Sequence, residues 1–313
     1  MTLNERAHHL CDELAANADR FRVAVSTVAG ARVIDCGGAV TGGLDAGLWL
    51  ARVCTANLAE VRYSLPPIPS LPFPGVWVAS DDPVRACLAC QYAGLAVKTD
   101  GFFGMGSGPL RAVSGREPLF DHIPGREDSR YAVGVLESRR HVTEDVVAHL
   151  VGKLPTTVEK LTLLVAPTGS IAGTTQVVAR SLETALHKLH ELGFDVNQVV
   201  SGCGVAPLPP VTPHDLQAIG RTNDAILYGG RVTLWVRADD DQLAGIGPKV
   251  PASASADYGA PFADIYDRAG DFYKIDPLLF SPAEVTFVNL TSGRCHTFGR
   301  TDEGVLRRSF LGA

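Results

Sequence analysis

Short apolar, β-branched runs alternate with longer helical segments along the chain, and this alternation constrains the fold more than any other feature. Strands are predicted at 22–35 (a hairpin), 61–63, 75–80, 131–136, 161–166, 231–238, 284–290 and 294–298. Helices are predicted between them, at 3–21, 44–58, 81–97, 143–154, 174–192 and 214–230. Interleaved elements of both kinds predict an α/β (α+β) fold with mixed sheets.

The 313 residues are enough for two modest domains. The sequence predicts an N-terminal α/β domain at 1–145 and a C-terminal α/β domain at 146–313. In an alternative division, the C-terminal segment packs back on the first domain.

Charge and cysteine content exclude several classes of protein. The net charge of −6 argues against binding to nucleic acid or to an anionic membrane, which needs a concentrated basic surface. The seven scattered cysteines are typical of reduced thiols. The polar, acidic start is unlike a signal peptide, and no apolar run approaches the ~20 residues of a membrane span. We therefore predict a cytoplasmic protein.

Two short motifs suggest cofactors but lack the context that would support them. Cys87 and Cys90 form a CxxC inside an apolar helix, without a second pair at zinc-site spacing. The run GMGSG at 104–108 is like part of a dinucleotide loop, but no predicted helix follows it. We predict neither a metal nor a nicotinamide cofactor.

The helix at 174–192 carries the most informative pattern. Its apolar face is predicted to hold Val178, Leu182, Ala185, Leu186 and Leu189, and its polar face Gln176, Arg180, Glu183, Thr184 and His187. Arg180 and Glu183 are three residues apart, so their side chains can meet. This pair is either a solvated surface ion pair or a general base kept ionised by a guanidinium.

Longer strings of residues are more specific than these patterns. They are AGLAVKTDGFFGMGSGPLRA (93–112), PTGSIAGTTQVVARSLETALHKLHELGFD (167–195), APLPPV (206–211), AIGRTNDAILYGG (218–230), SASADYGAPFADIY (253–266) and DFYKIDPLLFSPA (271–283). From about residue 5 to 298, the chain resembles the methenyltetrahydromethanopterin cyclohydrolases, most weakly at 114–130.

The resemblance implies a reversible hydrolysis of the methenyl bridge of a pterin one-carbon carrier, giving the N5-formyl form. It implies a substrate cleft between two mixed-sheet domains, with Glu183 as the general base, Arg180 holding that carboxylate, and Lys98 contributed by the other domain. It also implies a homotrimer. No cofactor is needed, because the amidinium carbon of the substrate is already electrophilic.

Small and polar residues in the same strings are candidates for binding the substrate. Gly106 and Ser107, together with Gly104 and Gly108, would let backbone amides approach a flat ring. Thr168 and Ser170 follow a buried strand, where α/β proteins usually bind ligands. The remaining candidates are Thr222, Asn223 and Asp224, which follow Arg221 and could donate to or accept from the amide-like edge of a pterin. For each of these the alternative is a turn or a helix cap.

Three other functions stay open at this point. A folate-type carrier is one, although the dinucleotide-binding motifs of folate cyclohydrolases are absent from the sequence. A pterin-binding homologue without catalysis is another, against which Arg180, Glu183 and Lys98 argue together. A generic oxidoreductase is the third, and failure to bind nicotinamide or flavin would exclude it.

Overall fold

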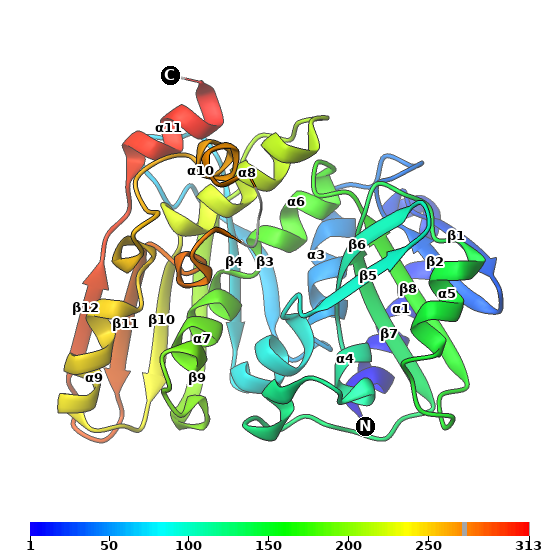
Figure 1. Ribbon diagram of the computed structural model, residues 1–313, viewed down its shortest axis with the longest axis horizontal. Helices are drawn as coiled ribbons and strands as arrows, with labels where there is room; N and C mark the ends of the chain where they lie inside the picture. Colours follow the sequence, from blue (N-terminus) through cyan, green and yellow to red (C-terminus); the bar gives the residue numbers. More distant parts are fainter. Residues whose placement is uncertain (271–273, 313) are drawn as a thin grey trace. The chain divides into compact units, whose positions relative to one another are not determined.

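The computed structural model describes residues 1–270 and 274–312. The chain forms two compact units, one of Met1–Ala59 with Arg85–Val177 and one of Glu60–Val84 with the chain from Val178 onward. Each unit contains a mixed sheet of six strands (Figure 1). The predicted α/β class with two mixed sheets is confirmed.

The first sheet has the strand order β1-β2-β8-β7-β6-β5. The strands are β1 (Ala24–Val28), β2 (Ala31–Asp35), β5 (Leu95–Thr99), β6 (Phe102–Ser107), β7 (Tyr131–Glu137) and β8 (Lys160–Ala166). Strands β2, β8 and β7 are parallel, so their carboxyl ends meet at one edge of the sheet. The other neighbours in this sheet pair antiparallel.

Helices cover both faces of the first sheet. They are α1 (Leu3–Ala16), α2 (Ala18–Phe21), α3 (Leu44–Cys54), the helical segment Val84–Gln91, α4 (Leu110–Ser114), α5 (Glu144–Val151) and α6 (Ile171–Val178). Residues of α1, α3 and the start of α6 form a core with one face of β2, β7 and β8. Residues of α4 and α5 form a second core with the other face.

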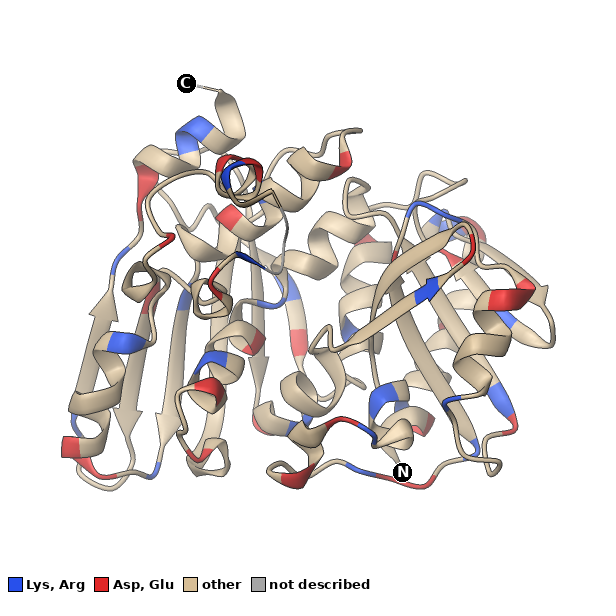
Figure 2. Ribbon diagram, in the orientation of Figure 1, with Lys and Arg blue, Asp and Glu red and all other residues tan. Residues whose placement is uncertain are grey.

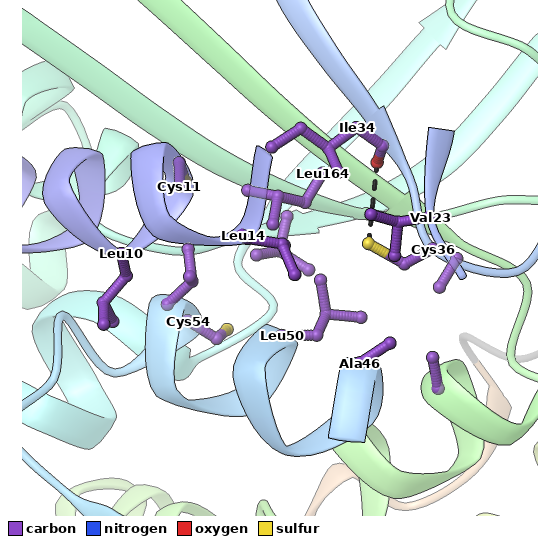
Figure 3. Packing of buried hydrophobic residues seen from close by; sticks show 14 of the residues in the cluster. Leu10, Cys11, Leu14, Val23, Ile34, Cys36, Ala46, Leu50, Cys54 and Leu164 are labelled. Atoms are coloured by element: carbon purple, nitrogen blue, oxygen red, sulfur yellow. Dashed lines mark hydrogen bonds between the residues drawn. The ribbon is translucent and has the colours of Figure 1, made fainter. Parts of the chain in front are cut away.

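Figure 3 shows the first of these cores, where cysteines lie among leucines. The Cys36 thiol donates to the carbonyl of Ile34 at 3.7 Å. Burial raises the pKa of Cys11 to about 12, so this thiol stays protonated and packs as a small apolar group. All seven cysteines are free.

The second sheet has the strand order β12-β11-β10-β9-β4-β3. Its strands are β3 (Glu60–Ser64), β4 (Gly75–Ser80), β9 (Val199–Pro207), β10 (Arg231–Val236), β11 (Glu284–Asn289) and β12 (Cys295–Gly299). Its helices are α7 (Ser181–Glu191), α8 (Asp215–Leu227), α9 (Asp240–Ile246), α10 (Phe262–Ala269) and α11 (Glu303–Leu311). Helix α7 packs on β9, β10 and β4, and α8 contacts β9, α10 and α11.

Three predicted elements were wrong in their bounds or their type. The helix predicted at 174–192 is two helices, α6 and α7, separated at Ala179–Arg180. The helix predicted to run to residue 97 ends at Gln91, and β5 follows because its residues pair with β6. The segment from residue 201, for which neither strand nor helix was predicted, is part of β9, which pairs with both β4 and β10.

The units divide the chain differently from a single boundary at residue 145. Strand β8 pairs with β2 and β7, so residues up to Val177 belong with the first unit. Strand β4 pairs with β9, which joins Glu60–Val84 to the second unit. The C-terminal segment also belongs to the second unit.

Acidic and basic residues are interspersed along the helices and loops of both units (Figure 2). In the part of the chain that the structure describes, no helix is long and apolar enough to cross a membrane.

Candidate functional site

The first turn of α7 holds the predicted catalytic pair. Arg180 is the N-cap residue, and its carbonyl accepts a hydrogen bond from the N–H of Thr184 at 2.9 Å. Glu183 lies in the first turn, where the positive end of the helix dipole favours a carboxylate. The two residues are only 5% and 4% exposed, so the alternative of a solvated surface ion pair does not hold. Gln176 of α6, predicted on the same face, is buried as well.

Glycines on β9 allow this turn to lie close to the sheet. A Cβ atom on Gly202 would lie 2.7 Å from Leu182 Cδ1. One on Gly204 would lie 2.6 Å from Ser181 Oγ and 3.1 Å from the Leu182 nitrogen. At Gly202 a larger residue would move the end of the Leu182 side chain, whereas at Gly204 it would also press on the α7 backbone at Leu182.

Helix α7 also contains a buried cation, Lys188, five residues beyond Glu183. Its ammonium donates to the carbonyl of Leu278. Burial lowers the pKa of Lys188, and the nearby charge of Asp276 partly offsets this effect. The hydrogen bond from Lys188 therefore holds the segment around Leu278 against α7, the helix that bears Glu183.

Lys98 lies in a different setting, on the edge strand β5. It is exposed and stands directly opposite Phe103 in the antiparallel pairing of β5 with β6. Asp100 and Gly101 join the strands, and Gly101 has a φ of 76°, a conformation that glycine adopts readily.

Thr168 and Ser170 follow β8 at the edge where the parallel strands have their carboxyl ends. Ser170 Oγ donates to the carbonyl of Pro167 at 2.8 Å and accepts from the N–H of Gly173 at 3.0 Å. The Thr168 carbonyl accepts from the hydroxyl of Thr174 at 2.8 Å. Ser170 thus caps the start of α6, and both side chains are half-buried.

Gly106 and Ser107 lie inside the first unit. A Cβ atom on Gly106 would lie 2.9 Å from the carbonyl oxygen of Leu95, so the neighbouring strand occupies that space. The Ser107 hydroxyl lies 3.2 Å from the Cys54 sulfur and 3.5 Å from the carbonyl oxygen of Val135. Their role in binding substrate stays a prediction, and their described contacts are with the protein itself.

Thr222, Asn223 and Asp224 lie on α8. The side chains of the first two donate to carbonyls of their own helix. Asp224 accepts from the N–H of Phe262 at 2.8 Å and from the hydroxyl of Ser309 at 2.6 Å, and so joins α8 to α10 and α11. Burial raises the pKa of Asp224 to about 7, against the opposing effect of these two hydrogen bonds.

A cavity of about 380 Å³ lies beside this aspartate. It is lined by residues of α8, α10 and α11 and the segments next to them, which are Gln217, Gly220, Arg221, Asp224, Pro261, Ala263, Asp264, Arg308, Ser309 and Gly312. Arg221 donates to the carbonyls of Pro210 and Ser309, at 3.1 and 3.2 Å. Of the predicted substrate residues on α8, Asp224 borders the cavity. Its carboxylate and the Arg221 guanidinium also bind Ser309 of the C-terminal helix.

The predicted site residues thus fall into four places, one of which is the interior of the first unit, with Gly106 and Ser107. Lys98, Thr168 and Ser170 belong to the carboxyl edge of the first sheet, Arg180 and Glu183 to the start of α7, and Thr222–Asp224 to α8. Phe103 was missed by the sequence analysis. The Asp100–Gly101 pair, a typical two-residue hairpin turn, is the sequence signal that would have indicated the hairpin bearing it.

Across residues 1–270 and 274–312, no group of three or more His, Cys, Asp and Glu side chains could hold a metal ion. The first three residues of the string at 271–283 lie outside the described residues. An α/β protein with a buried carboxylate at a helix N-terminus is suited to hydrolytic chemistry by general-base catalysis.

Comparison with known proteins identifies the family. The family model for Cyclohydrolase (MCH) matches residues 2–310, so the chain belongs to this family of hydrolases. A protein of Rhodopirellula baltica named methenyltetrahydromethanopterin cyclohydrolase is 46% identical, over 98% of this chain and 94% of the relative. Proteins of the same name from a Methylobacterium species and from Methanococcoides burtonii are 45% and 38% identical, over 99% of this chain and 97% and 98% of theirs.

Proposed function

We propose that the protein catalyses the reversible hydrolysis of 5,10-methenyltetrahydromethanopterin to N5-formyltetrahydromethanopterin. The observation that carries this proposal is the near full-length match to relatives named for that substrate, with Arg180 and Glu183 buried at the start of one helix. We further propose that it acts in the cytoplasm, as a homotrimer and without a cofactor.

Glu183 activates the water in this mechanism. Its carboxylate takes a proton as the water oxygen bonds to the methenyl carbon, which forms a tetrahedral adduct. The hydroxyl of the adduct then gives up its proton to form the formyl C=O bond as the bond from that carbon to the nitrogen other than N5 breaks. The departing nitrogen receives one proton, and the carbon stays on N5 as a formyl group. The cation and water thus yield a neutral formyl product and one proton.

The remaining residues hold the reacting groups. Arg180 keeps Glu183 ionised and oriented, and the packing of α7 on β9 fixes the backbone that bears both. Lys98 binds oxygen atoms of the pterin or of the adduct. The substrate also contacts a set of small and polar residues, which are Gly106, Ser107, Thr168, Ser170, Thr222, Asn223 and Asp224.

The test follows the loss of methenyl absorption with wild-type protein and with Glu183→Gln, corrected for spontaneous hydrolysis. Wild type should accelerate the loss, and the variant should lose about 10²–10⁴-fold in kcat, the usual contribution of a general base. Equal rates for both proteins would contradict the assignment of Glu183. No acceleration by folded wild type would contradict the function.

A further inference from the structure

The β5–β6 hairpin extends beyond the strand it pairs with. Its two strands pair from Leu95↔Gly106 to Thr99↔Phe102. Strand β6 pairs with β7 only at Met105, Gly106 and Ser107, so the outer half of the hairpin passes the end of β7 (Figure 1). This outer half lies at the sheet edge where β2, β7 and β8 have their carboxyl ends.

One face of the hairpin anchors it to the protein. Val97 and Phe102 are buried in the core formed with α4 and α5. The opposite face, which we call the outer face, consists of Ala96, Lys98, Phe103 and Met105. It continues the sheet face covered by α3, since Ser107 on that face contacts Cys54 of α3.

Phe103 is the unusual member of the outer face. It is 57% exposed, and among the exposed large hydrophobic residues in the described ranges it is the one aromatic. A charge at the position of Lys98 is typical of edge strands, where it discourages pairing with another chain. This reading explains Lys98 but not an exposed phenyl ring beside it, which favours association.

The arrangement fits a flat, positively charged ligand. Aromatic faces attract cations and stack on conjugated rings. The methenyl substrate is both conjugated and cationic, whereas its formyl product has lost the charge. Lys98 stands directly opposite Phe103 and can contact ligand oxygens while the ring contacts the conjugated system.

We propose that Phe103 stacks on the conjugated amidinium system of the substrate and favours the methenyl form over the formyl form. The inference rests on the proposed function and adds a binding residue to it. Met105, half-buried on the same face, extends the apolar surface with a polarizable thioether.

The test measures dissociation constants for the methenyl and formyl forms in a Glu183→Gln background, where turnover is slow. Phe103→Leu should weaken binding of the methenyl form about tenfold and of the formyl form less than about threefold, as expected for loss of a cation–π contact. Phe103→Tyr should keep both constants near the parent values. Val25→Ala, on the exposed edge strand β1 of the same sheet, is the matched control and should change neither.

Thermal unfolding of each variant checks that the exposed substitution leaves the fold intact. An unchanged constant for the methenyl form, or an equal change for both forms, would overturn the proposal. Wild-type turnover separates the two ideas: if it is fast and Phe103→Leu binds like the parent, only the stacking role fails. If wild type neither binds nor converts the methenyl form, both fail.

Discussion

The candidate site residues at the start of α7 are buried, whereas those on the β5–β6 hairpin are exposed to solvent. Arg180 and Glu183 are enclosed and set by the contact of α7 with glycines of β9. Lys98 of the edge strand β5 and Phe103 of the adjacent β6 lie on the exposed face of a hairpin whose other face is anchored. Enclosed groups gain a fixed geometry at a cost in solvation, which suits proton transfer. Exposed groups keep their solvation and suit ligand capture.

Helix α8 extends the comparison, because Asp224 is enclosed like Glu183 but contacts α10 and α11. A buried polar residue in this protein can therefore serve the fold as well as the chemistry. The predictions below separate these roles, from the largest expected effect to the smallest.

The largest effect is expected for Asp224→Asn. The pKa of Asp224 is raised to about 7 in the folded state from 3.8, so its protonated form stabilises the fold at low pH. That stabilisation is lost as pH rises from about 4 to about 7, by about 1.4 kcal/mol per unit. Between pH 5 and pH 8 the free energy of unfolding should fall for wild type, and this fall should be about 2–3 kcal/mol smaller for the variant.

Urea unfolding at the two pH values measures this difference. Asp267→Asn is the control, because Asp267 is an exposed carboxylate on the neighbouring helix α10. Identical pH slopes for wild type and Asp224→Asn would show that Asp224 is ionised at low pH despite its burial. A change in KM with no change in slope would favour the predicted substrate contact.

The next effect, on the start of α7, is expected for Gly204→Ala. The added methyl would lie 2.6 Å from Ser181 Oγ, and overpacking of this kind costs about 1–3 kcal/mol. Because the displaced turn bears Glu183, kcat should fall about tenfold or more, beyond what lost stability explains. Gly245→Ala on α9, where the added methyl meets nothing within 4 Å, should leave kcat unchanged.

The regions compared above differ in how much of their structure could be predicted from the sequence alone. The fold class, most strands and the Arg180–Glu183 spacing followed from residue patterns and resemblance. The break between α6 and α7 did not, because no proline or glycine marks Ala179–Arg180. The break separates a helix that packs in the first unit from one that packs on the second sheet, and that is tertiary information.

The β5–β6 hairpin was missed for a different reason. The apolar run that ends in Val97 reads equally well as helix or strand, since periodicity cannot distinguish the two in short buried segments. Strand β9 was missed because its glycines resemble a loop, although they leave room for α7. The deciding contacts of β9 come from residues far away in the sequence, in β4 and β10, whereas those of β5 come from the neighbouring β6.

Lys98→Gln tests the exposed side of the comparison. We expect KM for the methenyl form to rise about fivefold with a smaller change in kcat, because an exposed cation contributes to binding by about 1 kcal/mol. The melting temperature should not move. Lys160→Gln, an exposed lysine at the first residue of β8, is the control. A loss of kcat with unchanged KM would mean that Lys98 acts in the chemical step, as an enclosed residue would.

The smallest effect is expected for Ser170→Ala, which lies between the two extremes. Its hydroxyl caps α6, so its loss should reduce the unfolding free energy by about 1 kcal/mol. If capping is its whole role, KM stays at the wild-type value, and Ser170→Asp, which keeps an acceptor for the Gly173 N–H, restores stability. If Ser170 binds substrate, as predicted from its place after β8, KM rises in both variants. Kinetics and urea unfolding of the pair therefore decide whether this half-buried serine belongs with the structural or the ligand-binding residues.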